Sequence, residues 1–575
     1  MYLWIDTNKY GHKTFYVKKS FRKPDGKTGS KTIENLGRLE DLEKLYPDPV
    51  AWAKDYIDEL NRREKEEQLA VTVKFLPNEQ IQKDEQQLFE GGYLFLQKIY
   101  HELRLDYICK KISEKYRFEY DLNEILSRLI YGRILSPSSK LSTYDYSSRL
   151  LEKSSFELQD IYRALDVIAE ESQYIQSSMY KFSKDIGKRN DKILYYDCTN
   201  YYFEIEQERG MCKYGVSKEN RPNPIVQMGL FMDGDGIPLA FCLNDGNTNE
   251  QTTLQPLERQ IIDEFGHAKF IVCTDAGLSS ISNRKFNDKS QRAFVTTQSI
   301  KKMKDFQKEW ALSPEGWHLA KGTGTFNLEG ILANENTSNM FYDKIFYKEQ
   351  WFNENGLEQR YIVTFSIKFR NYSRKVRNEQ ISRAQKAIDS PVKADRTRQT
   401  DYKRFILKTS VTSEGELADK KLYSLNKDVI ADEEKYDGFY AVATNLEDDV
   451  NSIISINKGR WEIEENFRIM KTEFQSRPVY LRKDNRILAH FTTCFIALTV
   501  FRYLEKKLQG KYTCSQIRDG LNDIKFFKLA EEGYAPAYMR NDFTDDLHDV
   551  FGFRTDYQIL SKSSLRKIIS NTKKK

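Results

Sequence analysis

Two aspartates have the sequence context of a metal-binding catalytic site. Asp197 follows the apolar run Ile193–Tyr196, and Asp275 follows the apolar run Phe270–Thr274. Each aspartate is therefore expected where a buried strand ends, and neighbouring strand ends would bring the two carboxylates close together. Like charges that close are unfavourable unless a cation lies between them. The alternative is an ordinary turn, where aspartate is common.

Glu464 is the third candidate, because two cations share its predicted helical face. At about 100° per residue, Arg460, Glu464 and Lys471 lie within about 40° of one another around one helix axis. A carboxylate that holds Mg²⁺, flanked by cations that hold phosphates, is the arrangement expected at a phosphodiester. The alternative is a simple surface ion pair between Arg460 and Glu464.

The types of residue near these acids favour a hard cation. Three carboxylates without a His or Cys cluster favour Mg²⁺ or Mn²⁺ over Zn²⁺. The seven cysteines are far apart and form no Cys-x-x-Cys motif, which argues against structural zinc and disulfides and for a reducing cytoplasm. We find neither a signal-peptide layout nor an apolar run of about 18 to 20 residues, so no membrane association is expected.

The order of elements from residue 189 onward predicts an α/β, RNase H-like fold. Strands are expected at Ile193–Tyr196, Ile225–Met232 and Ile237–Leu243, then a helix near 252–265 and a strand at Phe270–Thr274. We expect a mixed-sheet core in two parts, 189–300 and 436–510, the second with the glutamate helix. A β-rich insertion at 301–435 is expected to interrupt it.

The flanking regions are expected to be mostly helical. Residues 1–75 predict a small β-rich unit, with a hairpin around Pro24-Asp25-Gly26, followed by a helix. Residues 76–188 predict helices, including an apolar stripe from Leu122 to Ile134, and could form a DNA-binding region. Residues 511–575 predict a helical, basic C-terminal region.

Positive charge is concentrated in two places, although the net charge of the chain is only +6. The stretch Lys368–Lys408 has thirteen Lys and Arg residues against four acids, and Arg554–Lys575 has seven against one. Such stretches favour contact with phosphates, and the alternative is that they are solvated surfaces.

The sequence resembles the bacterial insertion-sequence DDE transposases. The similarity rests on Tyr195–Thr199 around Asp197, Thr274–Leu278 around Asp275, and the Arg460-x3-Glu464-x6-Lys471 spacing. The last matches the subclass with a Tyr-x2-Arg-x3-Glu-x6-Lys signature, except that Asn457 occupies the tyrosine position. Gly215–Pro222 also resembles the family, with Lys218 and Arg221 as candidate phosphate contacts.

The resemblance implies metal-dependent cleavage of DNA at the ends of an insertion sequence, followed by strand transfer into target DNA. Asp197, Asp275 and Glu464 would hold two Mg²⁺ ions, for which Mn²⁺ can substitute. The partners would be the terminal inverted repeats, the target DNA and further copies of the chain, as a homodimer or larger synaptic complex. A hairpin intermediate and a nucleoid-associated location in a bacterial cytoplasm are also implied. In relatives an aromatic residue of the insertion stabilises an unstacked base, and the candidates by type are Trp310, Trp317 and Trp351.

Two other functions stay open from the residues alone. An RNase H-like nuclease that only hydrolyses nucleic acid would have the same acidic site. A catalytically silent, transposase-derived DNA-binding protein is disfavoured by the presence of all three acids, although Asn457 departs from the signature.

Overall fold

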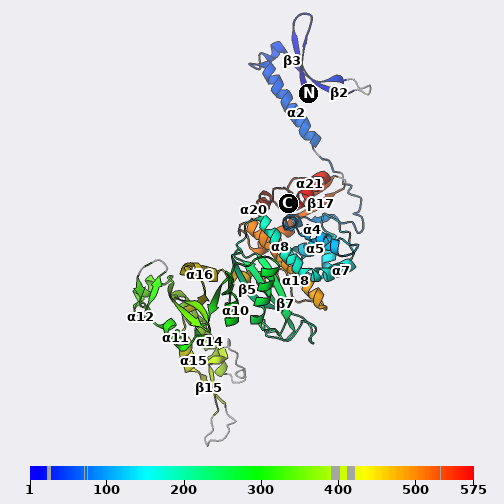
Figure 1. The fold of residues 1–575 in the computed structure, drawn as a ribbon. Helices are drawn as coiled ribbons and strands as arrows, with labels where there is room; N and C mark the ends of the chain where they lie inside the picture. Colours follow the sequence, from blue (N-terminus) through cyan, green and yellow to red (C-terminus); the bar gives the residue numbers. More distant parts are fainter. Residues whose placement is uncertain are drawn as a thin grey trace. The chain divides into compact units, whose positions relative to one another are not determined.

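The computed structural model describes residues 1–575 except 23–27, 70, 74, 320–321, 323, 390–401, 411–420, 531 and 575. The chain divides into two compact units (Figure 1). One unit consists of Met1–Glu85 and Lys528–Tyr534, and the other of Gln86–Phe527 and Ala535–Lys575.

The N-terminal unit is a three-stranded antiparallel sheet with helices on one face. Its elements are β1 (Tyr2–Thr7), β2 (Lys13–Arg22), β3 (Thr28–Arg38), α1 (Leu39–Leu42) and α2 (Pro49–Leu69). Phe15 of β2 packs against Leu42 and Ala53 of the helices. The predicted hairpin is confirmed by the pairing of β2 with β3, while its turn, Pro24–Gly26, lies outside the described residues.

Helices form one side of the larger unit. They are α3 (Tyr93–Glu102), α4 (Leu105–Lys115), α5 (Leu122–Leu135), α6 (Lys140–Ser147), α7 (Leu158–Glu170), α8 (Ser172–Ile186), α18 (Asp484–Lys507), α19 (Cys514–Asp523), α20 (Asp542–Phe551) and α21 (Lys562–Thr572). The short strand β4 (Leu88–Glu90) accompanies them, while β17 (Lys525–Leu529) and β18 (Gly533–Pro536) each have residues in both units. The apolar stripe at Leu122–Ile134 forms α5, whose N-terminus is capped by Asp121.

Helix α18 packs against α5, α7 and the sheet strand β7. Of the described helices, α18 alone is long and apolar enough to cross a membrane, so the expectation that no segment is that long was wrong. However, 89% of its most apolar window is buried inside the protein. Phe495 of α18 packs against Phe241 of β7, with the rings tilted and their centroids 5.1 Å apart, as expected for a core helix.

A mixed sheet forms the centre of the larger unit and confirms the α/β, RNase H-like fold. Its central strands are β5 (Ile193–Tyr202), β6 (Ile225–Asp233), β7 (Pro238–Asp245), β8 (Ile271–Thr274), β9 (Ala293–Gln298) and β16 (Phe439–Thr444). They lie in the order β16-β9-β8-β5-β6-β7. Strand β6 is antiparallel to both β5 and β7, and β16 is antiparallel to β9, whereas β8 is parallel to both β5 and β9.

Helices and short turns link these central strands. They are η1 (Glu250–Thr252), α9 (Leu254–Asp263), α10 (Ile281–Phe286), η2 (Ile300–Lys302), α15 (Lys427–Glu434), α16 (Val450–Lys458), α17 (Trp461–Arg468) and η5 (Ile469–Glu473). Side chains from one face of the sheet and from the helices that cover it form a continuous apolar core, for example Tyr196 on β5, Phe231 on β6 and Leu257 on α9. This core fixes the position of the strand ends.

The segment at 301–435 extends the central sheet. Its elements are α11 (Asp305–Leu312), β10 (Trp317–Leu319), β11 (Thr325–Phe326), α12 (Leu328–Ala333), α13 (Glu335–Met340), β12 (Phe346–Glu354), β13 (Leu357–Phe365), α14 (Ile367–Ile388), η4 (Tyr402–Phe405), β14 (Ile406–Ser410) and β15 (Lys421–Leu425). Strands β11-β10-β12-β13 continue the sheet beyond β16.

The described part of the basic stretch lies largely on a helix. Strand β13 ends at Phe365, and α14 begins at Ile367. The Ser366 hydroxyl accepts a hydrogen bond from the Phe369 amide, a helix cap that ends the strand early. The remainder of the stretch, residues 390–401, lies outside the described residues.

A buried acid on α9 makes the stability of this core depend on pH. Burial raises the pKa of Glu258 to about 8. The Asn287 amide donates a hydrogen bond of 2.7 Å to the Glu258 carboxylate and lowers the pKa, but its effect is smaller than that of burial. The folded state therefore holds a proton that the unfolded chain releases near its ordinary value of 4.5. Stability is greatest below that value, falls as pH rises, and levels off above about 8.

Glu258→Gln should remove this pH dependence. The neutral amide keeps the shape of the acid, so we expect the variant to melt at a higher temperature than the parent at pH 8.5. At pH 5 the difference should be small, because both side chains are neutral there. Thermal unfolding at the two pH values is the measurement, and an equal difference at both would contradict the assignment.

Candidate active site

Asp197 and Asp275 lie side by side because of the register of two parallel strands. Tyr195 of β5 is opposite Cys273 of β8, and each aspartate follows two residues further along its own strand. Burial raises the pKa of Asp197 to about 6; the Lys218 ammonium lowers this pKa and the Asp275 carboxylate raises it. The structure therefore brings the first two predicted acids together.

Asp197 does not occupy the end of its strand, as the apolar run predicted. Strand β5 continues to Tyr202, because β6 pairs with it along its whole length while the shorter β8 pairs only with its first residues. Asp197 thus lies where β5 loses its parallel neighbour. Asp275 directly follows β8, and its carboxylate accepts a hydrogen bond from the Leu278 amide over 3.0 Å, which forms the turn there.

The second half of β5 holds the loop that contains Lys218. Asn200 is buried; its amide donates to the Val216 carbonyl over 3.0 Å and its oxygen accepts from the Lys218 amide. The Lys218 ammonium donates to the Cys198 carbonyl and lies 3.3 Å from the Glu250 carboxylate. Burial disfavours the charged ammonium, but the Asp197 and Glu250 carboxylates outweigh it and raise the pKa of Lys218.

The glutamate helix is anchored on the same two strands. The Tyr195 hydroxyl donates to the Ile456 carbonyl near the end of α16 over 2.9 Å. Gly459 is required at the following bend, because a Cβ there would lie 2.2 Å from the Tyr195 hydroxyl oxygen. On the far side of α17, Asn466 donates to the Gly236 carbonyl over 3.1 Å. These contacts fix the helix that presents Glu464.

Glu464 lies on the outer side of α17, with 65% of its side chain exposed. Its carboxylate is 3.8 Å from the Arg460 guanidinium, and the charge of Arg460 also lowers the pKa of Asp197. Arg460 therefore lies between the glutamate and the aspartates. Among the described residues, however, Asp197, Asp275 and Glu464 do not all come within 4.8 Å of one another.

Lys471 lies on a π-helix and not on a regular α-helical continuation of α17. From Ile469 to Glu473 the chain forms a π-helix, in which the Phe474 amide donates to the Ile469 carbonyl. Lys471 turns inward and is only 13% exposed, with its ammonium 3.3 Å from Glu219. Burial, together with the charge of Lys218, lowers the pKa of Lys471 to about 8.

Two residues beside Lys471, the acid Glu219 and the cation Arg477, were not predicted. Glu219 pairs with both Lys471 and Arg477, and Arg477 also lies over the Tyr202 ring at 5.9 Å from its centroid. The predicted Arg221 lies over the same ring at 4.4 Å. Sequence spacing gave no signal for Arg477, because the contact joins two segments that are far apart in the chain.

Asn457, which occupies the tyrosine position of the family signature, contacts a tyrosine from another part of the chain. The Asn457 amide donates to the Tyr440 hydroxyl over 2.9 Å, and that hydroxyl also contacts the Thr297 hydroxyl at 2.7 Å. Tyr440 and Asn457 line a cavity of about 390 Å³ together with Arg460 and Glu464. A tyrosine hydroxyl is therefore present beside the glutamate, but it comes from β16.

The tryptophans of the insertion differ in exposure. Trp317 is fully buried, with its indole N–H donating to the Ser313 carbonyl, and Trp310 packs partly buried against Phe352. Trp351 is 40% exposed but lines a cavity with four carboxylates, those of Asp288, Glu349, Glu358 and Glu447. Those charges disfavour an approaching phosphate. Trp461, which was not predicted, is 60% exposed and adjoins Arg460.

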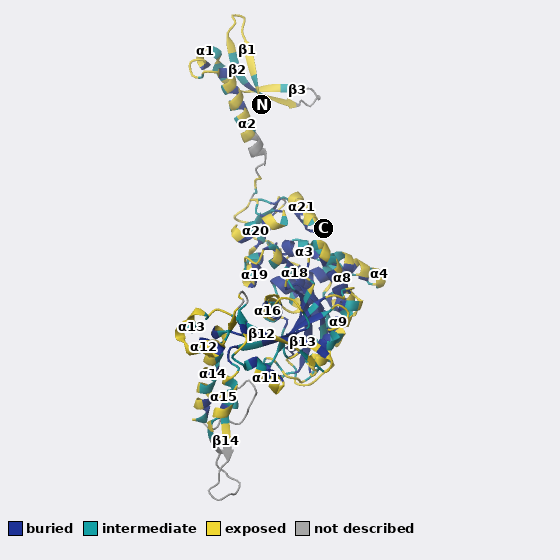
Figure 2. Ribbon diagram, turned by 60° about the vertical axis from the view of Figure 1, so that its left-hand side comes forward, coloured by how far each residue is buried: buried dark blue, intermediate teal, exposed yellow. Residues whose placement is uncertain are grey.

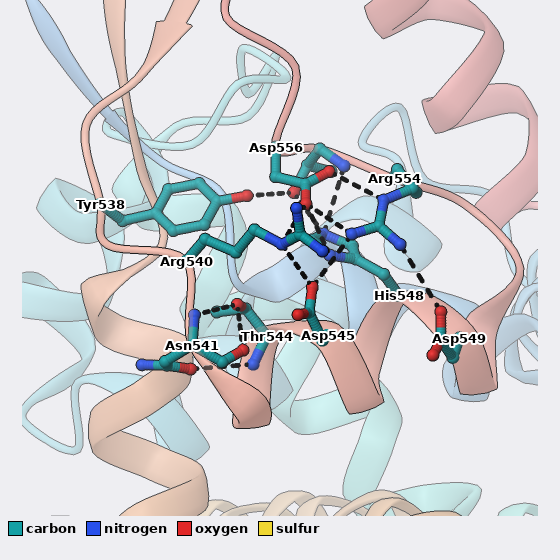
Figure 3. A network of polar contacts seen from close by, with 10 residues as sticks. Tyr538, Arg540, Asn541, Thr544, Asp545, His548, Asp549, Arg554 and Asp556 are labelled. Atoms are coloured by element: carbon teal, nitrogen blue, oxygen red, sulfur yellow. Dashed lines mark hydrogen bonds and ion pairs between the residues drawn. The ribbon is translucent and has the colours of Figure 1, made fainter.

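A second group of acids lies in the C-terminal region. Asp545, His548 and Asp556 bring ligand atoms within 4.8 Å of one another (Figure 3). The Arg554 guanidinium lies 2.6 Å from Asp556 and 3.0 Å from Asp545, and Arg540 lies 2.7 Å from Asp545. The arginines thus already neutralise these carboxylates. The same contacts occupy Arg554, the first cation of the predicted C-terminal basic region.

Comparison with known families identifies the family of this chain. The profile described as "Transposase DDE domain" matches residues 210–500, just over half of the chain. A second profile, "IS1634 family transposase, N-terminal domain", matches residues 5–71. The chain belongs to the bacterial insertion-sequence DDE transposases. It is a DNA transposase, which confirms the resemblance, while membership of the Tyr-Arg-Glu-Lys subclass stays a prediction.

More distant comparisons add little to this assignment. A structure titled "Cryo-EM structure of piggyBac transposase synaptic complex with hairpin DNA" aligns with 84% of the transposase and 85% of its own chain, at 9% identity and a TM-score of 0.36. No curated protein matches the sequence.

The acid pair of this transposase fits a divalent metal ion. DDE domains depend on such ions, and the residues present offer carboxylate oxygens, the ligands that hard cations prefer. The pKa of Asp197, raised by burial and by the charge of Asp275, shows that its negative charge is poorly compensated by the protein. A cation between the two carboxylates would remove that cost.

Lys471→Gln should weaken DNA binding by the transposase and reduce its dependence on salt. Loss of one phosphate contact lowers the slope of log affinity against log salt concentration by about 1. The matched control is Lys269→Gln, which removes an exposed lysine between α9 and β8. Binding of a labelled DNA duplex at several salt concentrations is the measurement. Equal slopes for the Lys471 variant and the parent would count against a phosphate contact.

Proposed function

We propose that this transposase uses Asp197, Asp275 and Glu464 to hold two Mg²⁺ ions, or Mn²⁺ in their place, and performs cut-and-paste transposition. It would cleave the element at its terminal inverted repeats and join the freed 3′ ends to target DNA. The observation that supports this best is the β5–β8 register, which juxtaposes Asp197 and Asp275 in a partly buried site.

The three acids have different positions and therefore different parts in this proposal. Asp197 and Asp275 are fixed on adjacent strands and provide the rigid half of the metal site. Glu464 is exposed and linked to them through Arg460, so its side chain would turn toward the aspartates to complete the site. The bound ions would activate the attacking oxygen and stabilise the leaving oxygen of the phosphodiester.

The cations around the acids would position the DNA backbone. Arg460, Lys471 and Lys218 act electrostatically on Asp197, and each already contacts a carboxylate, while Arg221 lies over the Tyr202 ring. A phosphate can replace such a carboxylate partner, because guanidinium and ammonium groups bind both kinds of anion. These contacts carry no sequence information and would fix the strand relative to the acids.

The proposed partners follow from the reaction. Insertion-sequence ends come in pairs, so two or more copies of the chain would bind two ends in one synaptic complex before cleavage. The protein would act on DNA in the nucleoid of a bacterial cytoplasm. Attack of the freed 3′ hydroxyl on the opposite strand, which joins the two strands of the element end in a hairpin and releases the flanking DNA, is one route to excision. No residue is required to form a covalent bond with DNA.

A nuclease without strand transfer is the second candidate, because its acidic site would be the same. The two differ in the fate of the 3′ end. A labelled duplex with the inverted repeat that flanks the gene is incubated with the protein, Mg²⁺ and a supercoiled plasmid. Label joined to the plasmid supports transposition, and cleavage with no joined product would favour the nuclease.

Asp197→Asn, Asp275→Asn and Glu464→Gln should each abolish cleavage of that duplex in Mg²⁺ or Mn²⁺. Each amide keeps the size of the acid but removes the negative charge that binds the ion. Duplex binding should persist, because the cations are retained. Asp263→Asn, at the exposed end of α9, is the matched control and should cleave like the parent. Robust cleavage by the Asp275 variant would overturn the assignment.

A further inference from the structure

Helix α14 has a packed side and an open side. Ile367, Arg377 and Ala384 are buried, and the Arg377 guanidinium lies 3.2 Å from the Glu434 carboxylate of α15. At about 100° per residue, these three positions share one side of the helix. Figure 2 shows exposed residues along α14. The side that faces away from α15 is therefore accessible to a partner.

A row of hydrogen-bonding side chains runs along the open side of α14. Asn371, Lys375, Asn378 and Ser382 lie within about 60° of one another around the helix axis. They line a shallow surface groove. Among the described residues, none of these four side chains has a hydrogen-bond or ion-pair partner. The row thus offers donors and acceptors that the fold does not use.

The surroundings of this row are positive. Helix α14 has seven Lys and Arg residues against one acid, Glu379. Measured from the line of Asn371, Arg374 lies about 60° to one side, and Lys368 and Lys386 lie about 60° to the other. Cations therefore border the hydrogen-bonding row on both sides. This arrangement favours a polyanion whose interior also carries donors and acceptors.

Duplex DNA is such a polyanion, and a helix of this kind fits its major groove. The groove of B-form DNA is about 12 Å wide and admits an α-helix. Asparagine can form two hydrogen bonds with the exposed edge of adenine, and serine can contact several bases. The phosphates that border the groove would meet the flanking lysines and arginine, which fix the helix relative to the duplex.

The first turn of α14 lies beside Glu464. Phe369 lines the same cavity of about 390 Å³ as Arg460 and Glu464. From there the row Asn371–Ser382 extends about 16 Å along the helix, at about 1.5 Å per residue. Base pairs are spaced by about 3.4 Å along a duplex, so the row spans roughly five base pairs. DNA that enters the site can therefore run along α14 directly next to the reacting phosphate.

Two sets of cations lie on different sides of the acid pair. The strand order β13-β16-β9-β8-β5-β6 places α14, which follows β13, on one side of β8 and β5. Lys218 and Arg221 belong to the segment between β5 and β6, on the other side. The DNA on either side of the reacting phosphate would thus meet a different set.

The two sets differ in how they are held. Lys218 and Lys471 each lie 3.3 Å from a carboxylate, that of Glu250 and that of Glu219. Cations oriented in this way suit the element end, which must stay bound from cleavage to joining. The row on α14 is exposed and unpaired, which suits DNA that binds later. After the flanking DNA has left, the target DNA takes its place.

We propose that the open side of α14 binds target DNA in the major groove next to the joining site and sets the target-site preference. Asn371 and Asn378 contact base edges, and Lys375 and Lys386 contact phosphates. This inference rests on the proposed strand transfer, to which it adds the surface that holds the target.

Base contacts are tested by sequencing insertion sites. Full-length protein is incubated with Mg²⁺, a gene-flanking inverted-repeat duplex that ends at the element's 3′ terminus, and a supercoiled plasmid. The parent should prefer certain bases within about five base pairs of the joint. Asn371→Ala combined with Asn378→Ala should reduce the preference at the contacted bases about tenfold. The matched control, Asn336→Ala with Asn339→Ala on the exposed surface of α13, should keep the parent profile.

Phosphate contacts are tested by the salt dependence of target binding. The protein is first loaded with the same inverted-repeat duplex, and a labelled target duplex is then added without Mg²⁺. Lys375→Gln combined with Lys386→Gln should lower the slope of log target affinity against log salt concentration by about 2. Binding of the inverted repeat itself should be unchanged. Lys269→Gln with Lys289→Gln, two exposed lysines that precede β8 and β9, is the control and should keep the parent slope.

Several results would overturn the proposal, once circular dichroism has established that each variant is folded. They are a parent profile in the asparagine variant, a parent slope in the lysine variant, and a parent protein without base preference near the joint. Weaker binding or cleavage of the inverted repeat by these variants, with an unaltered insertion profile, would assign α14 to the element end or its flanking DNA. In all these cases the parent still joins DNA, so the proposed function stands. No joined product from the parent would reject the proposed function together with this inference.

Discussion

The rest of the site depends on one electrostatically unfavourable contact, between the carboxylates of Asp197 and Asp275. Parallel pairing of β5 with β8 forces them together, and the apolar core behind both strands prevents them from moving apart. Burial and the like charge of Asp275 raise the pKa of Asp197 even though Lys218 opposes this. The favourable free energy of folding the core thus offsets the repulsion between the two carboxylates. Because a bound cation would relieve that repulsion, a cation is expected between them.

Glu464 differs from the aspartates in how it is held. Its helix is fixed through Tyr195, Gly459 and Asn466, but the carboxylate itself extends into solvent beside Arg460. The site therefore has a rigid half on the sheet and an adjustable half on α17. With this arrangement, Glu464 would complete the metal site only after ions and DNA bind, because the positive charge of the ions would attract its carboxylate toward the aspartates. Arg460 can favour either arrangement because it interacts with both Glu464 and Asp197.

Much of the fold could be predicted from sequence, because the central strands are apolar runs separated by clear turn signals. The order of strands and the pairing of Asp197 with Asp275 followed from that pattern. The true length of β5 did not, because it depends on β6 pairing beyond the end of β8. The π-helix at Ile469–Glu473 was also hidden, since a helical periodicity argument assumes a constant number of residues per turn. Contacts such as Arg477 with Glu219 join distant segments and leave no local pattern.

The distribution of charge, and not its total, accounts for how this chain can act on DNA. A net charge of +6 over 575 residues gives little overall attraction to a polyanion. Around the acid pair, cations are held ready by carboxylates such as Glu219 and Glu250, which keeps them from collapsing onto Asp197 and Asp275. A phosphate that replaces such a carboxylate must therefore bind in the orientation that the protein has set in advance.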